Sequence, residues 1–106
     1  MPVSLENRGA GRFAVQGELN LASVSTLWVE SVRLFKQQAP RCIDLAGVSR
    51  SDSAGIALLV EWLRQARAQG QDLQFVNVPP QMLAIIKVTD LDTLLPMARN
   101  QNRLWP

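Results

Sequence analysis

The sequence predicts an α/β sandwich in which a mixed β-sheet of four to five strands packs with three to four helices. A strand-like hairpin comes first, and apolar strand patterns then alternate with helical patterns. The chain has 106 residues, which suits a single hydrophobic core. We therefore treat residues 1–106 as one domain, with a core over about 3–95 and a C-terminal tail over about 96–106.

The first elements are two strands joined by a tight turn. Residues 3–8 indicate a weak first strand, and residues 12–17 alternate between apolar and polar types like a second one. The segment Gly9-Ala10-Gly11 between them is typical of a hairpin turn. Residues 17–20 interrupt the alternation, so we expect the second strand to end there.

A helix and a buried strand follow. Apolar residues recur at helical spacing over about 21–38, and either Asn20 or Ser23 could cap the start of this helix. Pro40 ends it. Residues 41–45 form a mostly apolar run, which predicts a central strand that is covered on both faces.

The second half of the chain repeats this alternation. Residues 52–69 have the apolar stripe of a second helix, which Gly70 can terminate. Residues 72–77 indicate another strand, and a short third helix runs from Pro80 to about Lys87. Leu94-Leu95 indicates a last edge strand or a loose turn.

Composition excludes several functional classes. The charged residues are 11 Lys and Arg against 9 Asp and Glu, without a basic run, which argues against a nucleic-acid partner. No apolar stretch is long enough to insert into a membrane or to act as a signal peptide. The single cysteine, Cys42, lies in an apolar strand pattern, and we expect a buried, inert thiol. These features favour a cytoplasmic protein.

The sequence also argues against catalysis. It contains no histidine, which removes the commonest general base and the commonest zinc ligand. Asp44 and Asp52 are not a credible acid–base pair, because Asp44 is expected to end a strand and to accept backbone N–H groups of the following turn. We find no phosphate-binding glycine loop and no metal-ligand cluster. We therefore predict no enzyme activity, no catalytic residue, no cofactor and no metal site.

The most informative segment runs from Cys42 to Val60. An apolar strand leads through a polar turn into an apolar helix, and Asp52 and Ser53 stand at the start of that helix. A helix N-terminus favours an anion, because its backbone N–H groups are unpaired and its dipole is positive there. Ser53 is therefore either a plain capping residue, a role that Ser51 or Asp52 could share, or a site for a phosphoryl group.

This segment resembles the signature of STAS domains. The matching residues are Gly17-Glu18-Leu19-Asn20, then Cys42-Ile43-Asp44-Leu45, then Asp52-Ser53-Ala54-Gly55. The resemblance implies that Ser53 is the regulatory phosphorylation site of the family or its equivalent. Gly55 has no side chain, so we expect it to allow a partner to approach Ser53 closely.

Within this family the chain resembles the MlaB type most. The features that carry this resemblance are the helix with Leu27-Trp28, the turn through Val48-Ser49-Arg50 and the short chain. The resemblance implies a small cytoplasmic subunit of the ABC transporter that moves phospholipids and maintains outer-membrane lipid asymmetry. It further implies docking on the ATPase subunit, MlaF, around Trp28 and the start of the second helix. The protein would then lie at the inner membrane through its complex, with the permease as an indirect partner.

One departure from this type leaves a second function open. The MlaB type commonly has Thr-Gly-Gly where this chain has Ser53-Ala54-Gly55, which is nearer to the anti-sigma factor antagonists. The alternative is therefore a serine phospho-switch whose partner is an anti-sigma factor kinase.

Three large apolar residues could belong to the core or to a partner surface. Trp28 falls on the apolar stripe of the first helix, and Leu58 and Trp62 lie beside the stripe of the second. We include them in the predicted partner-binding set, which comprises Trp28, Ser51, Asp52, Ser53, Ala54, Gly55, Leu58 and Trp62. Trp105 in the tail is either a docking anchor or part of an unpacked end.

Overall fold

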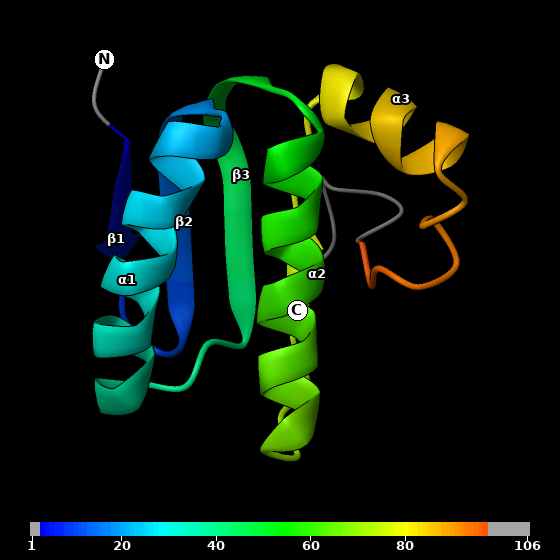
Figure 1. The fold of residues 1–106 in the computed structure, drawn as a ribbon. Coiled ribbons are helices and arrows are strands. Elements are labelled where there is room, and N and C mark those ends of the chain that lie inside the picture. The colour runs from blue at the N-terminus through cyan, green and yellow to red at the C-terminus, as the bar shows by residue number, and fades with distance from the viewer. Residues whose placement is uncertain (1–2, 98–106) are drawn as a thin grey trace.

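The computed structural model describes residues 3–97 and confirms the α/β class, with a mixed sheet covered by helices (Figure 1). The described part of the chain forms four strands and three helices. They are β1 (Ser4–Asn7), β2 (Arg12–Leu19), α1 (Leu21–Gln37), β3 (Cys42–Ser51), α2 (Ser53–Ala68), β4 (Gln74–Val76) and α3 (Pro80–Val88). The tail with Trp105, for which we expected an anchor or an unpacked end, lies outside the described residues.

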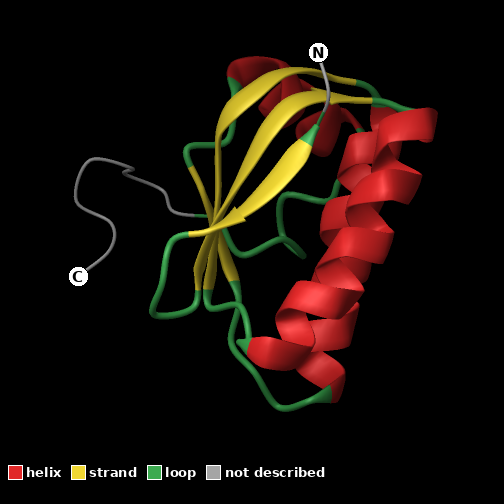
Figure 2. Cartoon of the chain, turned by 90° about the vertical axis from the view of Figure 1, so that its left-hand side faces the viewer, coloured by secondary structure: helices red, strands yellow, loops and turns green. Residues whose placement is uncertain are grey.

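The sheet has the strand order β1-β2-β3-β4. The β1–β2 pair is antiparallel, as expected of the hairpin, and β2–β3 and β3–β4 are parallel. Figure 2 shows α1 and α2 on one face of this sheet. Leu94-Leu95, for which we expected an edge strand or a loose turn, lies in a turn, and Met97 after it forms a single parallel bridge with Phe75 of β4. The folded part therefore extends at least to Met97, slightly past the expected end of the core.

β2 is longer than the sequence predicts. We expected it to end near Gly17, whereas the strand continues through Leu19. The parallel register with β3 shifts between Ala14 and Gln16 and again between Gly17 and Glu18, and Gly17 has a φ of 105°. A β-bulge of this kind absorbs the interrupted alternation without ending the strand. The prediction was wrong because a glycine in a strand can mark a bulge as well as an end.

α1 begins with a reciprocal cap. The Oδ1 of Asn20 accepts the Ser23 N–H at 3.0 Å, and the Oγ of Ser23 accepts the Asn20 N–H at 2.9 Å. Both residues that we considered as the cap therefore act together in a capping box.

β3 also departs from its predicted length. It runs from Cys42 to Ser51, so the polar stretch that we expected to be a turn is strand, and only Asp52 separates β3 from α2. β3 is central in the sheet, as predicted. Within the predicted run, Cys42, Ile43 and Leu45 are buried and Asp44 is half-buried, as expected of cover on both faces, whereas Ala46 and Ser49 in the added part of the strand are exposed.

Aromatic rings join α1, α2 and the sheet in the core. The ring centroids of Phe13 and Phe35 are 4.9 Å apart, and those of Phe35 and Trp62 are 5.9 Å apart, both in edge-to-face geometry. The indole N–H of Trp62 donates to the Oγ of Ser31 at 2.9 Å, and this hydroxyl donates to the carbonyl of Trp28 at 2.8 Å. Trp62 is 2% exposed and Ser31 1%, so the polar atoms buried between α1 and α2 are paired.

Gly55 holds the first turn of α2 against the ends of β2 and β3. A Cβ built on Gly55 would lie 2.1 Å from the Oγ of Ser51 and 3.0 Å from the Cβ of Leu19. The Ser51 hydroxyl is engaged, because it donates to the carbonyl of Asp52 at 2.9 Å. Any larger residue at position 55 must therefore displace the helix or the strand ends.

The substitution Gly55→Ala should therefore destabilise the fold, even though alanine is the better helix former. We expect a loss of about 1–3 kcal/mol in the free energy of unfolding, the usual cost of overpacking a tight site. Chemical denaturation measures it, with Ser53→Ala in the same turn as the matched control, since Ser53 is exposed. Equal stability of Gly55→Ala and the wild-type chain would contradict this packing.

Candidate partner-binding site

The starts of two helices lie side by side at one edge of the sheet. Leu19 and Ser51 are register partners at the ends of the parallel strands β2 and β3. The N–H of Asp52 donates to the carbonyl of Leu19 at 3.1 Å, which ties the two strand ends together. α1 begins at Leu21 and α2 at Ser53, so both helix N-termini open at this edge (Figure 1).

Asp52 caps α2, and Ser53 is the first residue of the helix. The Oδ1 of Asp52 accepts the Ala54 N–H at 2.8 Å, and its backbone carbonyl accepts the Gly55 N–H at 3.1 Å. Ser53 is exposed, whereas Ser51 is buried and bonded to the Asp52 carbonyl. The plain capping role thus belongs to Asp52, and the Ser53 residue is accessible to a partner.

The Asp52 cap also weakens the preference for an anion that the sequence suggests at the start of α2. The N-terminal end of a helix favours a negative charge by about 0.3–1 kcal/mol. In α2 the Asp52 carboxylate already occupies this position and takes up the Ala54 N–H. A second anion here, such as a phosphoryl group on Ser53, would be repelled by this carboxylate. The turn is therefore a weaker anion site than a helix start without an acidic cap.

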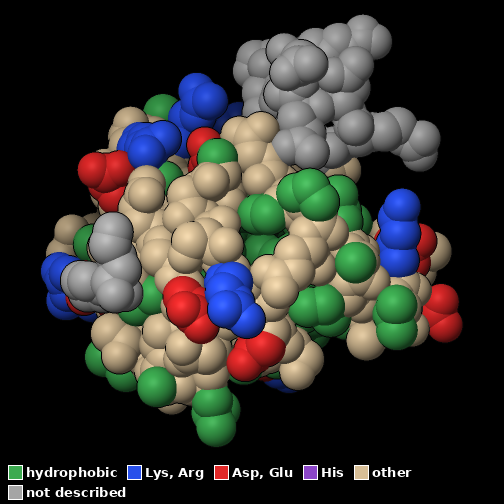
Figure 3. Space-filling model, turned by 90° about the horizontal axis from the view of Figure 1, so that it is seen from above, with side chains coloured by type: hydrophobic (Ala, Val, Ile, Leu, Met, Phe, Trp, Pro, Cys, Tyr) green, Lys and Arg blue, Asp and Glu red, His purple; other side chains and the backbone are tan. Residues whose placement is uncertain are grey.

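α3 completes this edge, although the sequence does not indicate it. The Oε1 of Gln81, in the first turn of α3, accepts the Ser51 N–H at 3.0 Å. The outer side of α3 carries Ala84, which is exposed, and Val88, which is 85% exposed. Figure 3, which looks down on this end of the molecule, shows hydrophobic side chains gathered on part of the face beside charged groups. A contact between residues 30 positions apart leaves no local signal, so sequence reasoning missed Gln81.

Four residues of the predicted partner-binding set lie in the interior, and one of them is Ser51, described above. Leu58 is 3% exposed and Trp62 2%, so the expectation that they form a surface patch is wrong. Both belong to the apolar core between the helices and the sheet, because the buried stripe of α2 is wide enough to include them. Gly55 is buried as well, and it makes room for Leu19 and Ser51 of the same chain, not for an approaching partner.

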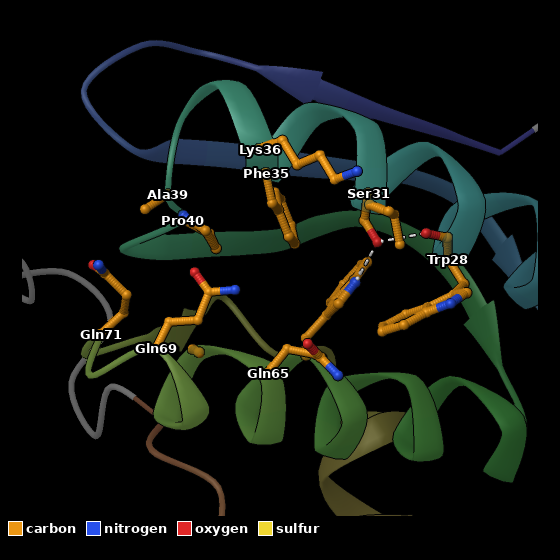
Figure 4. Close-up of a pocket in the computed structure, with 12 residues that line it drawn as sticks. Trp28, Ser31, Phe35, Lys36, Ala39, Pro40, Gln65, Gln69 and Gln71 are labelled. Carbon is orange, nitrogen blue, oxygen red and sulfur yellow. Dashed lines mark hydrogen bonds between the residues drawn. The ribbon is translucent and has the colours of Figure 1, made fainter.

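Trp28 lies away from the start of α2. It is half-buried on α1 and lines a recess between α1 and α2 that Trp62 and Gln65 also line (Figure 4). Ser53 does not line this recess. Of the predicted set, the structure therefore brings Asp52, Ser53 and the half-buried Ala54 together at the surface, and it places Trp28 on a neighbouring surface.

The Asp44 carboxylate makes hydrogen bonds within the fold. Asp44 lies within β3, not at its end as expected, but its Oδ1 does accept the Ala46 N–H at 2.9 Å. The same oxygen accepts a hydrogen bond from the side-chain amide of Asn77 at 3.0 Å, and the Arg8 guanidinium lies 3.9 Å from the other oxygen. Among residues 3–97, no three His, Cys, Asp or Glu side chains gather as metal ligands.

The Cys42 thiol is buried, as the sequence predicts. Burial raises the pKa of this thiol above its usual value, and the nearby Arg12 guanidinium opposes the shift only in part. A raised pKa disfavours the thiolate, which is the nucleophilic form of cysteine.

A separate observation concerns the membrane. Over the described residues, none of the three helices has both the length and the apolar character needed to span a bilayer.

Comparisons with known proteins give a family match and two similar curated proteins. A protein-family model described as "Mlab, STAS domain" matches residues 5–96. Two curated proteins, from Escherichia coli (strain K12) and Shigella flexneri, are each 32% identical to the chain over 78 residues. Both are named intermembrane phospholipid transport system binding protein MlaB, and the match covers 74% of this chain and 78% of each relative.

Solved structures show the same fold at lower identity. The anti-sigma factor antagonist SpoIIAA in its unphosphorylated form has a TM-score of 0.70 and 19% identity, over 94% of this chain and 90% of its own. An anti-sigma factor antagonist from Mycobacterium paratuberculosis has a TM-score of 0.75 and 20% identity, over 94% of this chain and 86% of its own. The four-stranded sheet with its three helices therefore has the architecture of these antagonists.

The raised pKa of Cys42 predicts a pH dependence of stability. Above a pH of about 9 the unfolded thiol loses its proton while the folded thiol keeps it, so the folded state binds more protons and stability falls as pH rises. Denaturation at a series of pH values should show this fall, and Cys42→Ala should reduce it. An identical alkaline fall in Cys42→Ala would assign the effect to other groups.

Proposed function

The chain belongs to the STAS domain family, in the branch of the MlaB domain, and from this membership we propose that it is a non-enzymatic interaction subunit of an ABC transporter. In this proposal it binds and supports the transporter's MlaF-like ATPase, and through the ATPase it contacts the permease indirectly. The complex would traffic phospholipids and maintain the lipid asymmetry of the outer membrane. The protein would be cytoplasmic and peripheral to the inner membrane through this complex.

The observation that carries the proposal is the similarity to MlaB. An identity of 32% over 78 residues, together with a family match over residues 5–96, covers all the elements from β2 to α3. A chain that matches 78% of a transport-system binding protein is better explained as a binding subunit than as an enzyme. The absence of histidine from the sequence agrees with this view.

The docking surface that we propose is the edge where α1 and α2 begin. Ser53 and Asp52 are exposed there, and Leu21, in the first turn of α1, is 78% exposed. The capped helix start offers hydrogen-bonding groups, and Leu21 adds apolar area beside them. Ala54 lies half-buried at the same edge, and Trp28 would extend the contact along α1.

The second candidate function is that of an anti-sigma factor antagonist, acting as a serine phospho-switch on an anti-sigma factor kinase. The specific observation in its favour is the exposed Ser53, which begins α2 directly after Asp52. Against it stands the Asp52 carboxylate, which opposes a phosphoryl group on the next residue. The genes next to this one separate the two functions, since ATPase and permease genes favour the first and a kinase gene the second.

Changing the charge at Ser53 should weaken the complex with the ATPase. Ser53→Arg and Ser53→Glu each place an uncompensated charge in the proposed contact, which we expect to cost about 2–5 kcal/mol of binding free energy. Co-purification of the ATPase with each variant, followed by titration calorimetry, measures the loss. Ala68→Arg is the matched control, because it adds the same charge at the exposed opposite end of α2. Undiminished binding of both Ser53 variants would rule out this docking surface.

Trp28→Ala should reduce binding of the ATPase more than it reduces stability. Trp28 is half-buried, so its truncation removes accessible contact area, and loss of an interface tryptophan often costs at least about 2 kcal/mol in binding. A thermal melt and a pull-down on the same preparation separate the two effects. Trp62→Phe, in the core, is the reference for a substitution that acts through stability.

If Trp28 acted only in the core, its removal would destabilise the fold by about 3–5 kcal/mol, and binding would fall only in proportion to the unfolded fraction. That result would remove Trp28 from the proposed docking surface.

A further inference from the structure

The recess between α1 and α2 has the size and lining of a small-molecule site. Its volume is about 380 Å³, within the range of ligand pockets. Trp28, Val32 and Phe35 of α1 line one side, and Gln65 of α2 and its C-cap Gln69 line the other. Buried Trp62 contributes to the same lining. The recess thus combines apolar and aromatic walls with a few polar groups.

The net charge of the residues that line the recess is positive. Among the described residues that line it, Lys36 alone carries a charge, and none is acidic. In the part of the chain that the structure describes, no carboxylate lies within salt-bridge distance of the Lys36 amine, whereas Arg33 on the same helix pairs with Glu30. The side-chain amides of Gln65 and Gln69 can donate hydrogen bonds to a ligand and can also accept them. The charge of Lys36 therefore favours an anionic ligand over a cationic one.

The shape of the recess favours a slender ligand over a partner helix. Ala39 and Pro40, which follow α1, and Gln69 and Gln71, which follow α2, bound one end of the recess (Figure 4). A helix laid along the groove would have to continue past these connecting segments, whereas a single chain can end against them. Ser31 offers nothing to a ligand, because its hydroxyl is already bonded to Trp62 and to the Trp28 carbonyl.

We propose that this recess binds a single-chain anionic amphiphile, with its acyl chain between the aromatic walls and its carboxylate beside Lys36. The chain would cover the exposed side of Val32, which is 42% exposed, and the inner side of Trp28. The proposal is independent of the transporter assignment, since it concerns the isolated domain. The contribution of Lys36 is modest, because its charge also faces the carbonyl groups at the end of α1.

The test uses the purified chain and dodecanoate, kept below the concentration at which dodecanoate forms micelles. Titration calorimetry and tryptophan fluorescence should show saturable binding of one molecule per chain. Lys36→Met should weaken dodecanoate binding by about fivefold, the size of a partly exposed charge pair, and leave the binding of uncharged dodecanol unchanged. Lys87→Met, on α3, is the matched control and should have no effect.

A second variant tests the recess itself. Gln65→Phe fills the recess from its exposed wall and should weaken both ligands by about tenfold, whereas Arg67→Phe, exposed but outside the lining, should not. Non-saturable binding, or equal effects of the variants and their controls, would overturn the proposal. So would a loss of dodecanol binding in Lys36→Met that matches the loss of dodecanoate binding. Binding of an amphipathic peptide in the recess without any binding of dodecanoate would assign the groove to a different occupant.

Discussion

The close approach of α2 to the ends of two strands is the constraint on which the candidate site depends. Gly55 lets the first turn of α2 rest on Leu19 and Ser51, where even a methyl group would collide. Because β2 and β3 are parallel and end in register, this contact brings the starts of α1 and α2 to the same edge. The packing of Gly55 in the first turn of α2 therefore fixes the position at which Ser53 is exposed. The position of the site thus follows from how the helices pack on the sheet.

A second constraint separates the interior from the surface. The hydrogen bond from Trp62 to Ser31 joins α2 to α1 within the core, and the ring of Phe35 packs edge-on against Trp62. The Trp62 indole is therefore not available to bind a partner protein, because its N–H is already hydrogen-bonded and its surface is buried. Trp28 differs, since only part of its surface is covered by the same helices.

Local chemistry could be predicted from the sequence, and non-local packing could not. The capping pair Asn20 and Ser23, the Asp52 cap and the helix periodicity depend on residues within a few positions, and they led to the correct elements. The depth of Leu58 and Trp62 depends on how α1 lies over α2, which periodicity does not encode. The extensions of β2 and β3 depend on bulges that only the pairing between the strands reveals. The Gln81 contact likewise depends on where the chain returns after β4.

The central claim is that the edge formed by the starts of α1 and α2 contacts a transporter ATPase. Hydrogen–deuterium exchange of the chain, alone and in complex with the purified ATPase, tests this claim most directly. The account predicts slower exchange in the complex over residues 52–57 and over the first turn of α1, with residues 4–7 of β1 unchanged. Protection confined to β1, or to the exposed face of the sheet, would contradict it.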